Sequence, residues 1–106
     1  MKPVRRRAIA RKDEEAAFDH YASEAGHSVA DAFADALREV YRLIAERPAI
    51  GSLRYARVAD LPDLRSRPVG RFPYLVFYID REAYVEVWRV LHGRRDILAL
   101  LTESGL

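Results

Sequence analysis

VEVWRVLHGRRD, residues 85–96, is the stretch of sequence that decides the fold of this chain. Its first seven residues, Val85 to Leu91, are mostly apolar and rich in valine, which is typical of a buried strand. Its last five residues, His92 to Asp96, contain a glycine and several charged groups, which is typical of a turn. The sequence therefore predicts a strand whose end presents an imidazole and two guanidinium groups.

Two further strands are predicted just before this one. Leu64–Val69 is half polar, which indicates an edge strand or a strand with one solvated face. Tyr74–Ile79 is continuously apolar, as expected of a strand that is covered on both faces. The polar residues Asp80–Ala83 predict a hairpin connection, after which Tyr84–Leu91 returns antiparallel. The second half of the chain is thus a three-stranded antiparallel meander.

The first half of the chain predicts two helices. Asp13–Ala25 carries one apolar stripe at helical spacing, with the acidic residues Asp13, Glu14 and Glu15 at its start and Gly26 as its C-cap. The second helix is predicted from Ser28, with Asp31 three positions on, to just before Pro48. Its apolar face recurs over more than four turns at Val29, Phe33, Ala36, Leu37, Val40, Leu43 and Ile44.

Two less regular segments complete the chain. Val4–Ala10 predicts a short first strand, and Gly51–Pro62 predicts a loop with at most a short helical turn. The order of strand, two-helix hairpin and meander predicts an α+β fold, as a single domain over residues 1–106. In this fold the second helix should pack Phe33, Leu37, Val40 and Ile44 against the sheet residues Tyr74, Val76, Tyr78, Val85, Val87 and Val90.

The composition excludes several classes of site. The chain has 106 residues, a formal net charge of +2 and no cysteine, and its histidines, His20, His27 and His92, are not in a ligand-like spacing. We therefore expect no disulfide, no metal and no cofactor. No apolar run is long enough for a signal peptide or a transmembrane segment, so we expect a cytoplasmic protein. The basic residues are arginines apart from Lys2 and Lys12, which suits phosphate or carboxylate recognition but is equally typical of a GC-rich coding sequence.

The residues from Arg89 to Ile97 resemble the end of the last core strand in the ParE toxins of the RelE/ParE superfamily. These toxins read arginine, two apolar residues, His-Gly, a variable residue, Arg-Asp and isoleucine. Arg47–Gly51 is similar to the Pro-x-Ile-Gly that closes the second helix in that family. Asp63–Arg71 is similar to its Leu-Arg strand and valine-glycine-arginine turn, and Tyr74–Tyr78 to its aromatic third strand. The resemblance runs from about Arg6 to Leu101.

The resemblance implies the toxin of a type II toxin–antitoxin module. A ParE-type toxin inhibits DNA gyrase without being an enzyme, and a ParD-like antitoxin neutralises it in a hetero-oligomer. The alternative is the RelE branch, whose members are ribosome-dependent mRNA endoribonucleases. Such a cleavage needs a proton acceptor and cations on the phosphate, for which the candidates here are Arg71, Arg89 and His92. A third possibility, an interaction domain without toxicity, shares all these fold signals.

The candidate catalytic residues also have ordinary structural interpretations. Arg89 in a strand is typically ion-paired, and the ring of His92 beside Gly93 typically bonds the backbone of a turn. Some nucleases of this fold carry a lysine cluster, or a glutamate and a C-terminal tyrosine, whereas this chain has no lysine after Lys12 and no tyrosine after Tyr84. We therefore favour a ParE-type toxin with no catalytic residues. Its expected target-binding residues are His92, Arg94, Arg95 and Asp96, which otherwise form a solvated turn.

The antitoxin surface is expected from the family alone. The resemblance implies an antitoxin that lays an amphipathic helix and an extended acidic segment across the toxin. The apolar contacts would be Phe18, Tyr21, Phe33 and Val40, which are otherwise core residues, and the basic contacts would be Arg57, Arg65, Arg67 and Arg71. No direct binding of nucleic acid is expected except through the complex with the antitoxin.

Overall fold

The computed structural model describes residues 1–104. The chain contributes four strands, three α-helices and one 3-10 helix within that range. In chain order they are β1 (Val4–Arg6), α1 (Ala8–Ala25), α2 (His27–Glu46), η1 (Pro48–Ile50), β2 (Leu64–Val69), β3 (Phe72–Asp80), β4 (Val85–His92) and α3 (Ile97–Ser104).

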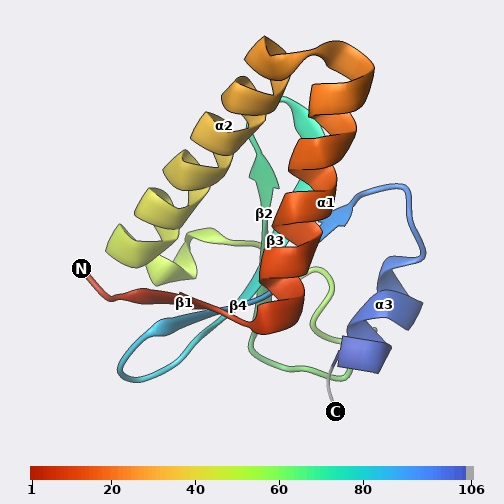
Figure 1. The fold of residues 1–106 in the computed structure, drawn as a ribbon. Coiled ribbons are helices and arrows are strands. Elements are labelled where there is room, and N and C mark those ends of the chain that lie inside the picture. The colour runs from red at the N-terminus through yellow and green to blue at the C-terminus, as the bar shows by residue number, and fades with distance from the viewer. Residues whose placement is uncertain (105–106) are drawn as a thin grey trace.

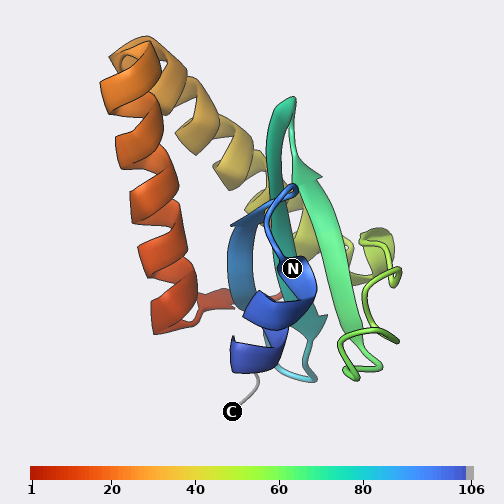
Figure 2. The same ribbon diagram turned by 90° about the vertical axis from the view of Figure 1, so that its right-hand side faces the viewer.

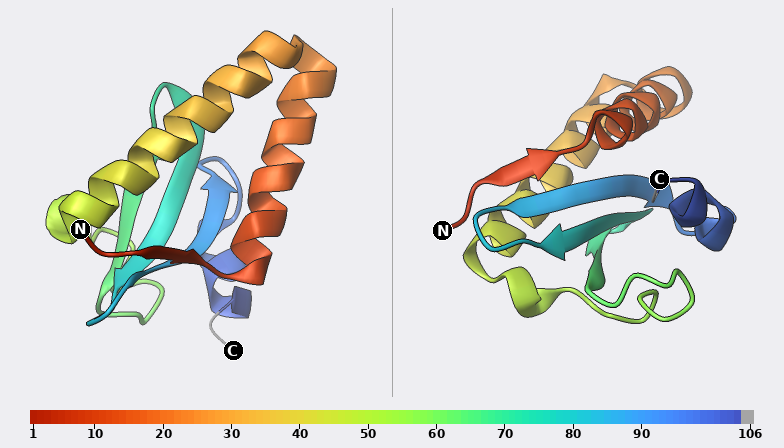
Figure 3. Two further views of the ribbon diagram at one scale, coloured as in Figure 1. Left: turned by 60° about the vertical axis from the view of Figure 1, so that its left-hand side comes forward. Right: turned by 90° about the horizontal axis from the view of Figure 1, so that it is seen from below.

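The four strands form one mixed sheet between two covering layers (Figures 1 and 2). The order across the sheet is β1-β4-β3-β2, with β1 parallel to β4 and the other neighbours antiparallel. The hairpin of α1 and α2 covers one face, whereas α3 and residues 51–63 lie on the other (Figure 3). The predicted α+β class, with a first strand, a helix hairpin and an antiparallel meander, is confirmed.

The main core lies between the helix hairpin and the sheet. The four α2 residues predicted to pack on the sheet, Phe33, Leu37, Val40 and Ile44, are buried there, because their spacing places them on one face of the helix. Tyr74 is partly buried and packs against this core. The packing predicted from the sequence is therefore confirmed, with the buried set comprising Phe33, Leu37, Val40, Ile44, Val76, Tyr78, Val85, Val87 and Val90.

The central strand β3 is covered on both faces, as its unbroken apolar sequence predicts. Val76 and Tyr78 belong to the main core, whereas Phe77 and Ile79 belong to a second core with Trp88. Because successive side chains of a strand alternate between faces, one continuous apolar run supplies both cores.

The half-polar strand β2 is an edge strand, and its outer edge is closed to further pairing. The backbone N–H of Ser66 donates to the carbonyl of Ser52 at 2.8 Å, and the N–H of Ser52 donates back at 2.9 Å. Pro68 has no N–H to offer. A proline and an occupied hydrogen-bonding position are common devices that protect a sheet edge.

The segment Arg47–Gly51 has a structural reason for its Pro-x-Ile-Gly pattern. The hydroxyl of Tyr78 donates to the carbonyl of Pro48 at 2.6 Å and accepts the N–H of Gly51 at 2.8 Å. A Cβ at position 51 would lie 2.5 Å from that hydroxyl, so only glycine fits there. Burial raises the pKa of Tyr78, which keeps its hydroxyl as a donor. The motif thus joins the end of α2 to the centre of the sheet.

The N-terminal boundaries predicted from the sequence are wrong. The strand ends at Arg6 instead of Ala10, and the helix begins at Ala8 instead of Asp13. Residues 8–12 are alanine, isoleucine, arginine and lysine, most of which favour helix, and their weak alternation is not a strand pattern. Asp13 and its acidic neighbours therefore lie in the second turn, and they do not act at the helix terminus.

The connection between the two helices is a single residue, Gly26. Helix α1 ends at Ala25 as predicted, but α2 begins at His27 and not at Ser28. The carbonyl of Gly26 accepts the N–H of Ala30 at 3.2 Å, so the glycine opens α2 and the predicted cap at Ser28 does not form. Gly26 has a φ of 93°, a conformation that other residues rarely adopt.

The remaining differences lie in the second half of the chain. Strand β3 extends beyond the predicted Tyr74–Ile79 at both ends, and β4 is shifted by one residue to Val85–His92. The short helix α3 is not predicted by the sequence analysis. Its eight residues are too few to be stable alone, and it forms because Ile97, Leu100 and Leu101 pack on the second core.

Candidate functional site

A β-bulge in β4 determines how the residues before the His92–Asp96 turn are placed. Phe77 pairs with Arg89 and Tyr78 pairs with Val87, so Trp88 is the extra residue. Val87 and Val90 consequently both reach the main core, although strict alternation would place them on opposite faces. The bulge also lies just beyond the point where β1 stops opposite Val87, so that the rest of β4 has no strand paired to its outer edge.

Arg89 is held at this edge by Asp13 from α1. Its Nε donates to Asp13 Oδ2 at 2.8 Å and its Nη2 to Asp13 Oδ1 at 2.9 Å, while Nη1 donates to the carbonyl of Leu100 in α3 at 3.3 Å. Asp13 Oδ2 also accepts the N–H of Val90 at 3.0 Å. The two side chains are only 9% and 13% exposed. The Asp13–Arg89 pair therefore connects α1, β4 and α3.

This pair confirms the ordinary interpretation of Arg89 as an ion-paired strand residue. The hydrogen bond with the Asp13 carboxylate raises the pKa of Arg89, so the guanidinium stays charged and occupied. Sequence reasoning missed the role of Asp13. The only available signal was that a strand arginine among apolar residues needs a carboxylate, and the chain contains 16 Asp and Glu residues.

Three hydrogen bonds from its backbone N–H groups hold the His92–Asp96 turn. Gly93 N–H donates to the Pro73 carbonyl at 2.7 Å, and Arg95 N–H donates to the His92 carbonyl at 3.1 Å. The ring nitrogen Nδ1 of His92 accepts the N–H of Arg94 at 3.1 Å. This contact confirms the expectation that the His92 ring bonds turn backbone. It also places the ring proton on Nε2, because an acceptor nitrogen carries none.

Asp96 ends the turn and begins the next helix. Its Oδ1 accepts the N–H of Ala99 at 3.2 Å, as an N-cap residue does. Arg94 and Arg95 are exposed, and neither makes an ion pair with any residue among 1–104. Arg71, in the β2–β3 turn, is also exposed at this end of the sheet. The turn therefore presents two uncommitted guanidinium groups on a fixed backbone.

A groove of about 460 Å³ opens between the two helices of the hairpin. Phe18 from α1 and Phe33 and Leu37 from α2 supply its apolar lining, and Glu15, Asp19 and Arg38 stand among its polar residues. At one end the hydroxyl of Tyr41 donates to Glu14, which also accepts from Arg6 at 2.8 Å. Burial and the Glu14 charge raise the pKa of Tyr41, so it remains protonated. The groove thus combines an apolar lining with an acidic side along α1.

The structure distributes the residues expected to bind an antitoxin over several places. Phe33 and Val40 are 1% and 3% exposed and belong to the core, although each also lines a groove. Tyr21 packs its ring against Phe33, Phe72 and Tyr74, with ring centres 5.1 to 6.0 Å apart.

The four arginines expected to contact the antitoxin differ in whether their side chains are already hydrogen-bonded within the protein. Arg65 donates to the carbonyls of Ala49 and Gly51 at 3.1 and 2.8 Å, so it supports the loop after η1. Arg67 lines a groove of about 380 Å³ beside α2. Arg57 and Arg71 are exposed. Arg57, Arg67 and Arg71 form no ion pair within residues 1–104.

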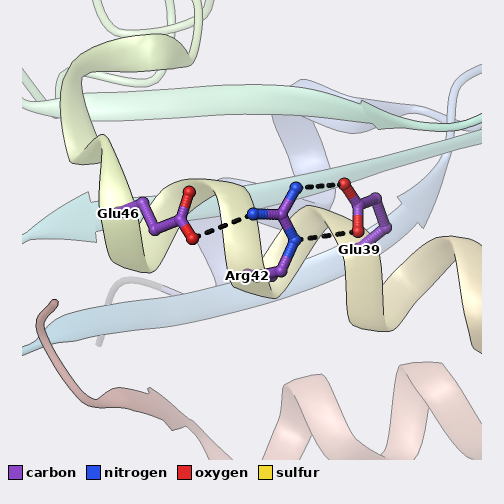
Figure 4. Close-up of polar contacts among 3 residues, drawn as sticks. All are labelled: Glu39, Arg42 and Glu46. Carbon is purple, nitrogen blue, oxygen red and sulfur yellow. Dashed lines mark hydrogen bonds and ion pairs between the residues drawn. The ribbon is translucent and has the colours of Figure 1, made fainter.

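The outer face of α2 carries an ion-pair cluster that is not a candidate site (Figure 4). Arg42 donates to Glu39 at 2.5 and 3.0 Å and to Glu46 at 2.9 Å. These hydrogen bonds raise the pKa of Arg42 and lower that of Glu39. All three side chains are 40% exposed or more, so the pairs contribute little to stability.

Neither a metal-binding cluster nor a membrane-spanning helix is found among the described residues. Residues 1–104 contain no group of three or more histidine, cysteine or acidic side chains that could hold a metal ion. Within the same range, no helix is long and apolar enough to span a membrane.

Comparison with known proteins identifies the family. The family model described as "ParE toxin of type II toxin-antitoxin system, parDE" matches residues 4–97. No curated protein sequence matches the chain. A solved structure described as "Chromosomal ParDE TA system from P. aeruginosa" is similar over 87% of this chain and 96% of that chain, with a TM-score of 0.72. Its identity is 18%, so that likeness shows the fold alone. Because the family match spans most of the chain, the protein belongs to the ParE toxins of the parDE type II toxin–antitoxin system.

Proposed function

We propose that this ParE-family toxin acts in the cytoplasm by inhibiting DNA gyrase through its His92–Asp96 turn. The main support is the pair of exposed guanidinium groups of Arg94 and Arg95, which sit on a backbone held by three hydrogen bonds. Fixed cations without an internal partner suit electrostatic recognition of another protein. His92 and Asp96 serve mainly to hold the turn, so they support the contact indirectly.

The contact needs no catalytic residue in the toxin. Of the three residues considered for RNA cleavage, Arg89 is occupied by Asp13, and His92 already accepts a backbone N–H on Nδ1. Arg71 is exposed, and no ion pair joins it to an acidic side chain within residues 1–104. The ParE toxin family is not known as an enzyme family, which agrees with this proposal.

We further propose that a ParD-like antitoxin docks an amphipathic helix in the groove between α1 and α2. Phe18 and Phe33 would accept its apolar stripe, and Glu15 and Asp19 would meet basic residues on its flank. An extended acidic segment of the same antitoxin would follow the exposed arginines, Arg57, Arg67 and Arg71. The proposed complex therefore covers the helix hairpin and one side of the sheet.

The gyrase contact predicts different outcomes for two sets of substitutions. Arg94→Glu with Arg95→Glu should weaken inhibition of supercoiling by purified gyrase about tenfold or more, which is about 1.4 kcal/mol of binding energy. His92→Gln should retain most inhibition, because no proton transfer is required. The matched control is Arg54→Glu with Arg57→Glu, which makes the same charge change in the exposed 53–63 loop and should leave inhibition unchanged.

A parallel translation reaction separates this mechanism from the alternative. Message should remain intact in the presence of the toxin. Cleaved message with normal supercoiling, abolished by His92→Gln, would reject gyrase inhibition and establish the endoribonuclease. Loss of a general acid or base typically costs ~100- to 10,000-fold in rate, so the two outcomes are well separated.

The groove between α1 and α2 predicts which substitution should prevent the antitoxin from neutralising the toxin. Phe18→Asp should weaken antitoxin binding by about 2 kcal/mol or more, roughly thirtyfold, because it places a charge on the apolar lining. Toxicity should persist, and coexpression of the antitoxin should no longer restore growth. Ala32→Asp is the matched control, since Ala32 is exposed on α2 outside the groove. Equal antitoxin affinity for the two variants would place the docking site elsewhere.

A further inference from the structure

A cleft of about 220 Å³, smaller than the two grooves described above, lies between α1 and the end of β4. Figure 1 shows α1 passing beside this part of the sheet. The small side chains Ala16 and Ala17 line its helix side. Its polar lining comes from α1, β3, the end of β4 and the turn that follows. The polar residues are Asp13, His20, Tyr74, His92 and Arg95.

The cleft contains hydrogen-bond donors in excess of acceptors. Among the described residues, Asp13 is the one carboxylate that lines the cleft, and three hydrogen bonds from Arg89 and Val90 already occupy it. His92 carries its ring proton on Nε2, because Nδ1 accepts the Arg94 N–H. Arg95 forms no ion pair within residues 1–104, and the side chain of His20 forms no hydrogen bond there.

Tyr74 joins these donors into one cluster. Its ring meets that of His92 edge-on, with ring centres 5.2 Å apart. Burial raises the pKa of Tyr74, and the charge of Arg95 lowers it by less, so the phenol keeps its proton. A phenol, two imidazoles and a guanidinium therefore surround one small space.

We propose that this cleft binds a single carboxylate, contributed by an aspartate or glutamate side chain of the protein that the toxin inhibits. This inference rests on the proposed contact of the His92–Asp96 turn with a protein target, and it adds His20 and Tyr74 to that contact. Charge-assisted hydrogen bonds from Arg95 and the neighbouring donors supply the attraction. The volume suits one acidic side chain and not a folded element.

The surroundings favour a carboxylate over a nucleic-acid backbone. A phosphate backbone carries regularly spaced charges and needs a band of cations to follow it. Here the acidic residue Asp96 is exposed on the turn, and Asp19 is exposed beside His20 on α1. These charges oppose a polyanion but leave room for one isolated anion.

The test uses the histidine ring resonances of the purified toxin. N-acetylglutamate amide should shift the resonances of His20 and His92 saturably, whereas the neutral N-acetylglutamine amide should not. His27, the first residue of α2, does not line the cleft and should stay unshifted in both titrations. Arg95→Gln should weaken binding of the glutamate probe about tenfold or more, which is about 1.4 kcal/mol. Arg54→Gln, which makes the same change in the 53–63 loop and outside the cleft, is the control and should leave it unchanged.

Each other outcome has a definite meaning. Absence of a saturable shift at His20 and His92 in the unmodified toxin would overturn the carboxylate site. Binding of inorganic phosphate tenfold tighter than the glutamate probe would overturn the carboxylate and indicate a nucleic-acid ligand. The titrations contain no gyrase, so they are independent of the proposed target. Intact binding of the glutamate probe by a toxin that does not inhibit gyrase would retain the cleft and reject gyrase.

Discussion

Replacing Asp13 with alanine should lower the free energy of unfolding by about 3–5 kcal/mol, because it leaves a buried guanidinium without its carboxylate. Asp13 accepts two hydrogen bonds from Arg89 and a third from the N–H of Val90. Its loss therefore leaves both a charge and a backbone donor unsatisfied at the edge of β4 that no strand pairs with. The junction of α1, β4 and α3 depends on this one side chain.

Urea unfolding measures this effect directly, with Arg42→Ala as the matched control. Arg42 also bonds carboxylates on both sides, but its pairs are exposed on α2 (Figure 4). Removing it should change stability far less than removing Asp13, because water screens exposed ion pairs. The double variant Asp13→Leu with Arg89→Leu should be more stable than Asp13→Ala alone, because it also removes the guanidinium that Asp13→Ala leaves unpaired. A loss below about 1 kcal/mol for Asp13→Ala would show that the pair is not a structural connection.

Leu37→Ala should cost about 2–5 kcal/mol, because it removes a buried side chain from the main core and leaves a cavity. Leu37 is 7% exposed and packs among residues of α2 and the sheet. Leu53→Ala is the control, since Leu53 is 46% exposed in the loop and should change stability by less than about 0.5 kcal/mol. Thermal or urea unfolding of both variants provides the measurement.

Leu37 also lines the groove proposed for the antitoxin, which gives this variant a second use. A stability loss below about 1 kcal/mol would mean that the hairpin does not rest on the sheet as described. Excess antitoxin should recover part of the loss, because a ligand of the folded state stabilises it by mass action. The recovered part should be smaller than in the unmodified protein if the Leu37 side chain contacts the antitoxin.

The sequence alone determined the order and type of the main elements. The apolar face of the second helix and the unbroken apolar run of β3 depend on local periodicity, which is visible in a single chain. Both predictions were confirmed by burial on one face of α2 and on both faces of β3. The turn at His92–Asp96 was also visible, because glycine and charged residues after an apolar strand are a local signal.

Only the tertiary structure decided how the candidate site is assembled. Asp13 and Arg89 are 76 residues apart in sequence and meet because β1 stops short and leaves the β4 edge open to α1. The bulge at Trp88 arises from the pairing with β3, and α3 forms only because the second core receives it. Such features depend on packing between distant segments, which no local pattern encodes. For the same reason the sequence could not predict the cleft in which His20 and Tyr74 lie beside the turn.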